Sequence, residues 1–203
     1  RELVVINAAA WTNVDGAEKD PKGAFAVNAL GARNVADVCR KYSARLFHVS
    51  TNAVFDGLEG MFDETAHPQA GSRYGYTKLI GEEYVQEKMA GLAWHIVRTG
   101  FLYGKHGKNF GSKLFGRLRD GENVIADDYR SVQPTWARHL VETILAMIEK
   151  RVPSGIYHAI SDGPLTWCQF VADASGHIVA MKEHDGVGCA RATRFERGPG
   201  QAP

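Results

Sequence analysis

Leu46-Phe47-His48-Val49-Ser50-Thr51-Asn52 is a short, largely apolar run that passes directly into hydroxyl and amide side chains. After a loop, Tyr74-Gly75-Tyr76-Thr77-Lys78 opens a helical pattern. A buried strand, a turn and a helix follow one another in this way in α/β folds, whose ligands bind outside the carboxyl ends of the strands. The stretch from Ser50 to Lys78 therefore predicts an α/β fold with a site at the end of one strand.

Two side chains of that helix, together with one hydroxyl, predict acid–base chemistry. Tyr74 and Lys78 are four residues apart and share one face of a helix. A free phenol has a pKa of about 10, and a nearby ammonium lowers that pKa by favouring the phenolate. Thr51 offers a hydroxyl that holds a substrate carbonyl where Tyr74 can protonate it. These residues indicate carbonyl reduction or its reverse, although tyrosine and lysine also occur at this spacing by chance in many helices.

The flanking segments predict further strands and helices. Strands are expected at residues 3–6, 93–102, 124–126 and 155–160, and helices at about 25–42, 74–89, 110–119 and 136–150. The loop from Gly104 to Lys108 combines glycines and lysines just before a helix, which suits an anion such as a diphosphate. An ordinary solvated basic face is the alternative interpretation of that loop.

The amino-acid composition narrows the class of protein. The 203 residues are 44% hydrophobic, enough for one sizeable domain. A net charge of +1 predicts neither a nucleic-acid nor a membrane partner. Three widely spaced cysteines and eight scattered histidines predict neither disulfides nor a metal site, and they suit a cytoplasmic protein. Residues 176–203 are expected to form a loose tail, because they lack an apolar period and end in many Gly, Arg and Pro residues.

Several motifs in order resemble the landmarks of the extended short-chain dehydrogenases/reductases. The first three are Val5 to Thr12, Val14 to Glu18 and Phe25 to Asn28. Ser50 to Gly57 and Tyr74 to Leu79 are similar to one branch of that family, the dTDP-4-dehydrorhamnose reductases. The pairs that follow in the expected order are Arg98-Thr99, Asn109-Phe110, Pro134-Thr135 and Thr166-Trp167. The resemblance covers residues 3 to 171.

The resemblance implies a function and a domain organisation. NADPH or NADH would transfer a hydride to the C4 keto group of a dTDP-4-dehydro-6-deoxy sugar, the last step towards dTDP-L-rhamnose. Residues 1–103 would be the C-terminal portion of an NAD(P)-binding Rossmann domain, and residues 104–175 a mixed region with nucleotide-sugar-binding elements. The expected partner is the nucleotide-sugar substrate, and a homodimer is one expected assembly.

The resemblance also implies which residues form the site. Thr51, Tyr74 and Lys78 would be the catalytic hydroxyl, the proton donor and the partner that lowers its pKa. The residues expected to line the cofactor are Ala8, Ala9, Trp11, Ser50, Tyr74, Lys78, Arg98 and Thr99. The residues expected to face the nucleotide-sugar are Asn52, Phe101, Asn109, Arg130 and Thr135.

The sequence departs from the family's pattern in several places. Asn52-Ala53 stands where members carry Asp-Tyr, and Phe101 stands where a tryptophan is common. Members also begin with a strand and a Gly-x-x-Gly-x-x-Gly turn that cradles the cofactor pyrophosphate, and residues 1–203 contain no such turn. We therefore expect a partial, Rossmann-like, doubly wound parallel sheet that lacks its first strands, in a chain that is a catalytically incomplete fragment.

Two alternative functions remain open from the sequence. A non-catalytic, cofactor-binding regulatory subunit is one, because the methionine adenosyltransferase β subunit is similar in sequence to this reductase branch. Another nucleotide-sugar epimerase or dehydratase is the second. The presence of Thr51, Tyr74 and Lys78 together favours the reductase, and Asn52-Ala53 lacks the extra acid–base residues that dehydratases carry.

Overall fold

The structure is a computed structural model. It describes residues 2–57, 61–104, 110–120, 122, 124–127, 131–161, 163–170, 179–184 and 187–192. The chain divides into two compact units, and each is discontinuous in sequence. The first combines Arg1–Gly100 with Leu140–Ile160, and the second combines Phe101–His139 with Ser161–Pro203. The sequence-based boundary at residue 103 did not anticipate the return of residues 140–160 to the first unit.

The first unit is built on four parallel strands in the order β1-β2-β3-β8. The strands are β1 (Val4–Asn7), β2 (Arg45–Thr51), β3 (Trp94–Thr99) and β8 (Gly155–His158). Six of the seven β2 residues are buried, as expected for a strand of a parallel sheet that is covered on both faces. The prediction of an α/β fold with a parallel sheet is therefore confirmed.

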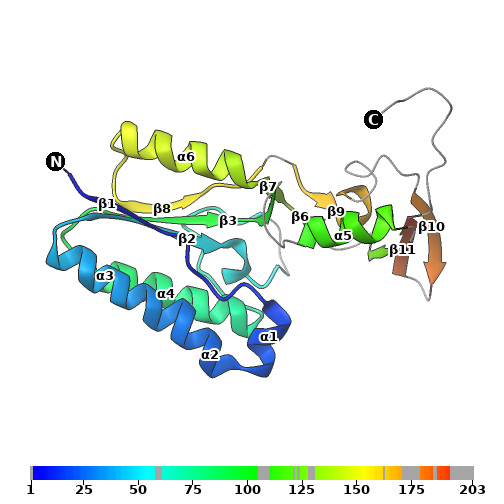
Figure 1. The fold of residues 1–203 in the computed structure, drawn as a ribbon, viewed down its shortest axis with the longest axis horizontal. Helices are drawn as coiled ribbons and strands as arrows, with labels where there is room; N and C mark the ends of the chain where they lie inside the picture. Colours follow the sequence, from blue (N-terminus) through cyan, green and yellow to red (C-terminus); the bar gives the residue numbers. More distant parts are fainter. Residues whose placement is uncertain are drawn as a thin grey trace. The chain divides into compact units, whose positions relative to one another are not determined.

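Helices cover both faces of this sheet. Figure 1 shows α3 (Gly31–Lys41) and α4 (Arg73–Lys88) on one face and α6 (Ala137–Glu149) on the other, which is the doubly wound arrangement. The segment before α3 comprises α1 (Val14–Lys19), α2 (Pro21–Phe25) and a π-helical turn, η1 (Ala26–Leu30). The sequence predicted one regular helix over residues 25–42. The apolar spacing does not reveal the wider turn at residues 26–30.

Small residues allow the helices to pack closely on each other and on the sheet. The core between α3, α4 and the strands consists of Ala32, Ala36, Cys39, Ala44, Leu46, Val85, Met89 and Ile96. Gly81 of α4 faces η1 so closely that a Cβ atom there would lie 2.5 Å from the Asn28 carbonyl oxygen. The close contact between η1 and α4 therefore depends on this glycine.

The second unit contains short strands and one described helix of ten residues, α5 (Phe110–Arg119). β4 (Phe101–Tyr103) pairs in parallel with β7 (Pro134–Trp136), and β6 (Ser131–Val132) pairs with β9 (Leu165–Thr166). A single strand was expected over residues 93–102. The structure instead ends β3 at Thr99 and begins β4 at Phe101, which pairs with a different neighbour.

Part of the segment 176–203, which was expected to be a loose tail, forms strands. β10 (Val179–His184) and β11 (Val187–Ala192) form an antiparallel pair, and β11 also pairs with β5 (Val124–Asp127). Backbone hydrogen bonds hold such a pair together, so it can form without a marked apolar period. Among the described residues, no helix is long and apolar enough to cross a membrane.

Candidate functional site

Thr51, Tyr74 and Lys78 come together where strand β2 ends and helix α4 begins. Thr51 is the last residue of β2, and its hydroxyl oxygen accepts a hydrogen bond from Ala53 N at 3.1 Å. Tyr74 and Lys78 lie in the first two turns of α4. The helix begins there because the Ser72 hydroxyl caps it by accepting a hydrogen bond from Gly75 N at 3.1 Å.

The Tyr74 phenol is half-buried and lies within hydrogen-bonding reach of the Thr51 side chain. Burial raises the pKa of this phenol above its ordinary value, and the hydrogen bond with Thr51 offsets part of that rise. Lys78 is not among the causes of this shift, so the expected lowering of the Tyr74 pKa by Lys78 stays a prediction. Loss of water around the phenolate outweighs the favourable hydrogen bond.

Lys78 is a buried cation, with 1% of its surface exposed. Its ammonium donates a hydrogen bond to the Val49 carbonyl oxygen at 2.8 Å. Burial lowers the pKa of Lys78 to about 8, against the charge of Glu82, which raises it. With this pKa the amine is mainly protonated at neutral pH, and it contacts the backbone of the strand that ends in Thr51.

A buried ion pair that the sequence did not predict lies beside these residues. Glu82 and Arg98 are 0% and 2% exposed, and Arg98 Nη2 donates to Glu82 Oε2 at 2.7 Å. Ser50 Oγ also donates to Glu82 Oε1, at 2.5 Å. Ser50 and Arg98 were expected to line a cofactor, but Ser50 Oγ and Arg98 Nε and Nη2 donate to Glu82. The sequence signal for a functional Glu82 was its four-residue spacing from Lys78. That spacing is usually interpreted as an exposed ion pair on a helix surface.

The segment that follows β1 is tied to helix α4. Trp11 N donates to Asn28 Oδ1 at 2.8 Å, and Asn28 Nδ2 donates to Trp11 O at 3.2 Å and to Thr77 Oγ1 at 3.0 Å. Ala8 and Ala9 are exposed at the carboxyl end of β1, the parallel neighbour of the strand that ends in Thr51. The structure therefore brings part of the expected cofactor segment to the edge of the sheet where β2 ends.

The other predicted site residues differ in exposure and lie in several elements. Asn52 is exposed immediately after Thr51, whereas Thr99 is buried at the end of β3, opposite Thr51 in the register. In the second unit, Thr135 is 2% exposed and its hydroxyl oxygen accepts from Ser161 N at 3.3 Å. Phe101 packs edge-on against Trp167 and Phe170, with ring centroids 5.2 and 5.7 Å apart. Asn109, Arg130 and residues 105–108 of the basic loop lie outside the described residues.

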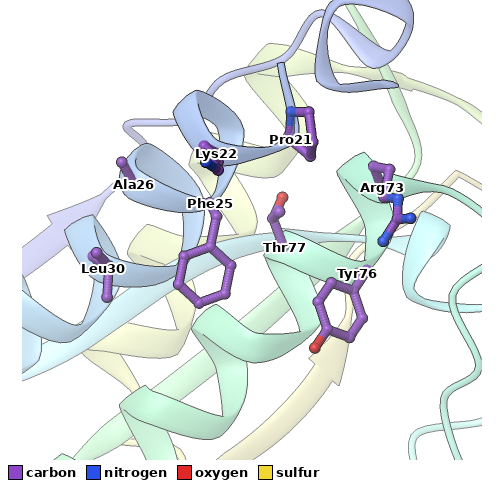
Figure 2. A pocket seen from close by; sticks show the side chains of 8 residues that line it. All are labelled: Pro21, Lys22, Phe25, Ala26, Leu30, Arg73, Tyr76 and Thr77. Atoms are coloured by element: carbon purple, nitrogen blue, oxygen red, sulfur yellow. The ribbon is translucent and has the colours of Figure 1, made fainter. Parts of the chain in front are cut away.

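A surface hollow lies on a different side of helix α4. Figure 2 shows its walls, which are Pro21, Lys22, Phe25, Ala26, Leu30, Arg73, Tyr76 and Thr77. Thr51, Tyr74 and Lys78 do not line it. The hollow is therefore separate from the candidate site, and none of the predicted site residues borders it.

The comparisons with known proteins agree with the resemblance read from the sequence. The model of the family described as the RmlD substrate binding domain matches residues 1–193. The chain is 41% identical over 173 residues to a dTDP-4-dehydrorhamnose reductase of Streptomyces griseus, covering 82% of this chain and 56% of the relative. It is 40% identical over 170 residues to one from Mycobacterium tuberculosis, covering 79% and 54%.

A solved structure of a reductase has a fold similar to that of this chain. It is the dTDP-4-dehydrorhamnose reductase of Bacillus anthracis in complex with NADP, with a TM-score of 0.79 and 33% identity. The match covers 85% of this chain and 62% of that one. The chain thus spans about 56% of the length of the curated Streptomyces griseus relative. On the strength of the family model, the identities and the shared fold, this chain belongs to the RmlD substrate binding domain family.

Proposed function

We propose that this chain is part of an NAD(P)H-dependent reductase that acts on the C4 keto group of a dTDP-4-dehydro-6-deoxy sugar, dTDP-4-dehydrorhamnose. The observation that carries the proposal is the grouping of Thr51, Tyr74 and Lys78 at the end of β2. The names of the relatives at 40% and 41% identity support the same reaction. The proposal includes a cytoplasmic location and a homodimer, and it includes no nucleic-acid or membrane partner.

The residues present fit a nicotinamide cofactor. An ammonium has three N–H donors, and the Val49 carbonyl takes one donor of Lys78, which leaves donors for ribose hydroxyls. Ala8 and Ala9 are exposed and small, so a flat group can approach the backbone after β1. NADPH or NADH, when bound, would supply the hydride for the carbonyl carbon.

Tyr74 supplies the proton in this proposal. Reduction of a ketone requires a proton at the carbonyl oxygen, and the raised pKa of the Tyr74 phenol keeps it protonated at neutral pH. The Thr51 hydroxyl lies beside the phenol and would orient the same oxygen. After the proton has left, the Lys78 ammonium stabilises the phenolate by its charge. Asn52, Phe101, Asn109, Arg130 and Thr135 are proposed to face the nucleotide-sugar, and residues 104–175 to carry its binding elements.

The test is a reductase assay that follows NADPH oxidation with dTDP-4-dehydrorhamnose as substrate. It is run on the chain alone and on the chain joined to the part of the Streptomyces griseus relative that precedes their match. We expect turnover in at least one of the two, with a loss of about 10²- to 10⁴-fold on Tyr74→Phe. The matched control is Tyr76→Phe, an exposed tyrosine of the same helix, which should leave the rate unchanged.

The outcomes separate the reductase from the regulatory alternative. Turnover that survives Tyr74→Phe would remove the catalytic assignment. NADPH binding, measured by fluorescence, without turnover in either version would favour a non-catalytic subunit. Conversion of the sugar without net oxidation of NADPH would point to an epimerase.

A further inference from the structure

The Glu82 carboxylate joins helix α4 to the ends of two neighbouring strands. Ser50 Oγ of β2 donates to Oε1 at 2.5 Å. Arg98 of β3 donates through Nε to Oε1 at 3.1 Å and through Nη2 to Oε2 at 2.7 Å. Ser50 and Arg98 are register partners in the parallel pair of β2 and β3. A single carboxylate thus fixes three elements at the edge of the sheet where the candidate site lies.

Glu82 is linked to that site through Ser50 and through its charge on Lys78. Ser50 immediately precedes Thr51 in β2. Lys78 lies one helical turn before Glu82 on α4, and the charge of Glu82 raises its pKa against the effect of burial. A displacement of the carboxylate would therefore move the hydroxyl of Thr51 and change the charge on Lys78 at the same time.

Among the residues that the structure describes, Glu82 is the anion whose charge raises the pKa of Lys78. His48 of β2 is buried beside Lys78 and stays neutral, because burial and the Lys78 charge lower its pKa to about 3. Tyr74 of α4 is a neutral phenol with a raised pKa. Arg98 of β3 is a cation that shares the Glu82 carboxylate.

We propose that Glu82 is a positioning residue of the candidate site, whose carboxylate fixes Thr51 through Ser50 and Arg98 and places a negative charge beside Lys78. The inference rests on the proposed function, since it assigns Glu82 a part in that reaction. Glu82 does not exchange protons with substrate in this account. It acts through Ser50, Arg98 and Lys78.

The electrostatic part is tested by the titration of Lys78 itself. In the chain labelled with ¹³C-lysine, the Cε resonance of Lys78 is assigned by its loss in Lys78→Met and followed against pH. Glu82→Gln keeps the shape of the side chain and removes its negative charge, so the titration midpoint of Lys78 should fall by about one pH unit or more. Glu83→Gln removes the same charge from the next, exposed residue of α4 and should not move the midpoint. Equal midpoints in wild type and Glu82→Gln would overturn the inference.

The geometric part is tested by Ser50→Ala, which removes one bond to Glu82 and keeps its charge. We expect kcat to fall roughly ten- to a hundredfold through misplacement of Thr51, with an unchanged KM for NADPH and an unchanged Lys78 midpoint. A wild-type kcat would overturn the positioning role. This variant also decides the matter if Glu82→Gln does not fold.

The same series separates the two proposals. Wild type and Tyr74→Phe are assayed alongside, and a wild type that is inactive both alone and joined to the preceding part of the relative would count against the proposed function. The Lys78 midpoint requires no turnover, so an unmoved midpoint overturns the inference about Glu82 whether or not the reductase assay succeeds. A Lys78 titration midpoint that falls in Glu82→Gln and not in Glu83→Gln supports the inference.

Discussion

Gly75 lies so close to Ala53 that a Cβ atom on the glycine would stand 2.1 Å from the Ala53 carbonyl oxygen. Gly75 directly follows Tyr74 in the first turn of α4, and Ala53 is two residues beyond Thr51. The contact is between two backbones, so neither side can yield by rotating a side chain. It sets the distance between the phenol-bearing helix and the strand that ends in Thr51.

Gly75→Ala should destabilise the protein although alanine favours helices. Alanine normally gains about 1 kcal/mol over glycine inside a helix, but crowding in a packed region costs about 1–3 kcal/mol. Urea denaturation should show a net loss, and any reductase turnover should fall because Tyr74 moves away from Thr51. Gly116→Ala in α5 is the control, since nothing lies within 4 Å of the place that a Cβ atom would take there. Equal stability changes in the two variants would contradict the role of the Gly75 contact.

Arg98→Met should destabilise the protein by about 3–5 kcal/mol, because it leaves the buried Glu82 charge without its partner. Lys88→Met removes a cation from the same region of sequence, but the Lys88–Glu87 pair is partly exposed. An exposed pair contributes about 0–1 kcal/mol, so this control should change little. Denaturant midpoints measure both, and similar losses would argue against a tightly packed Glu82–Arg98 pair.

In His48→Phe the free energy of unfolding should fall less steeply as the pH is lowered. Burial lowers the pKa of His48 from 6.5 to about 3 in the folded protein. Between those values the unfolded chain binds the extra proton, so the contribution of His48 is complete above pH 6.5 and declines as the pH falls towards 3. The slope is at most about 1.4 kcal/mol per pH unit. Urea denaturation across this range should show a shallower slope in the variant than in the wild type.

Asn28→Ala should loosen the segment after β1. The change leaves the part-buried Trp11 N and Trp11 O without their Asn28 partners, and a polar group left unpaired costs about 1–3 kcal/mol when it is fully buried and less here. We expect lower stability and, where NADPH binds, a higher Kd by fluorescence titration. Asn34→Ala, at an exposed position of α3, should leave the Kd unchanged and should not lower the stability, because alanine favours helices. An unchanged Kd with reduced stability would assign Asn28 a structural role alone.

Much of the fold could be predicted from the sequence because burial on both faces of a parallel strand leaves a direct mark. The run from Leu46 to Val49 and the strand near Ile96 show that mark plainly. The π-helical turn at Ala26–Leu30 leaves none, since one wider turn hardly shifts the apolar spacing. The β10–β11 pair is held by backbone hydrogen bonds, which residue types specify only weakly.

The residues of the candidate site, like the fold, could be predicted from the sequence only in part. Tyr74 and Lys78 could be selected because their four-residue spacing places them on one helix face, and Thr51 could be selected because it follows a predicted strand. Glu82 could not, because its partners Ser50 and Arg98 come from other elements, and only the folded sheet makes them neighbours. The direction of the Tyr74 pKa shift was likewise beyond the sequence, since it depends on how far the phenol is buried.

The interleaving of the two units has a consequence for protein synthesis. The sheet of the first unit takes its last strand, β8, from residues 155–158, and its second face is covered by α6. The ribosome must therefore produce the whole stretch from Phe101 to His139, which belongs to the second unit, before the first unit can close. Until then the side of β3 that later pairs with β8 is an open edge of the sheet, and such an exposed edge favours association between nascent copies. A protease cut at Gly100 would likewise not release the first unit in one piece, because part of its core would remain on the other fragment.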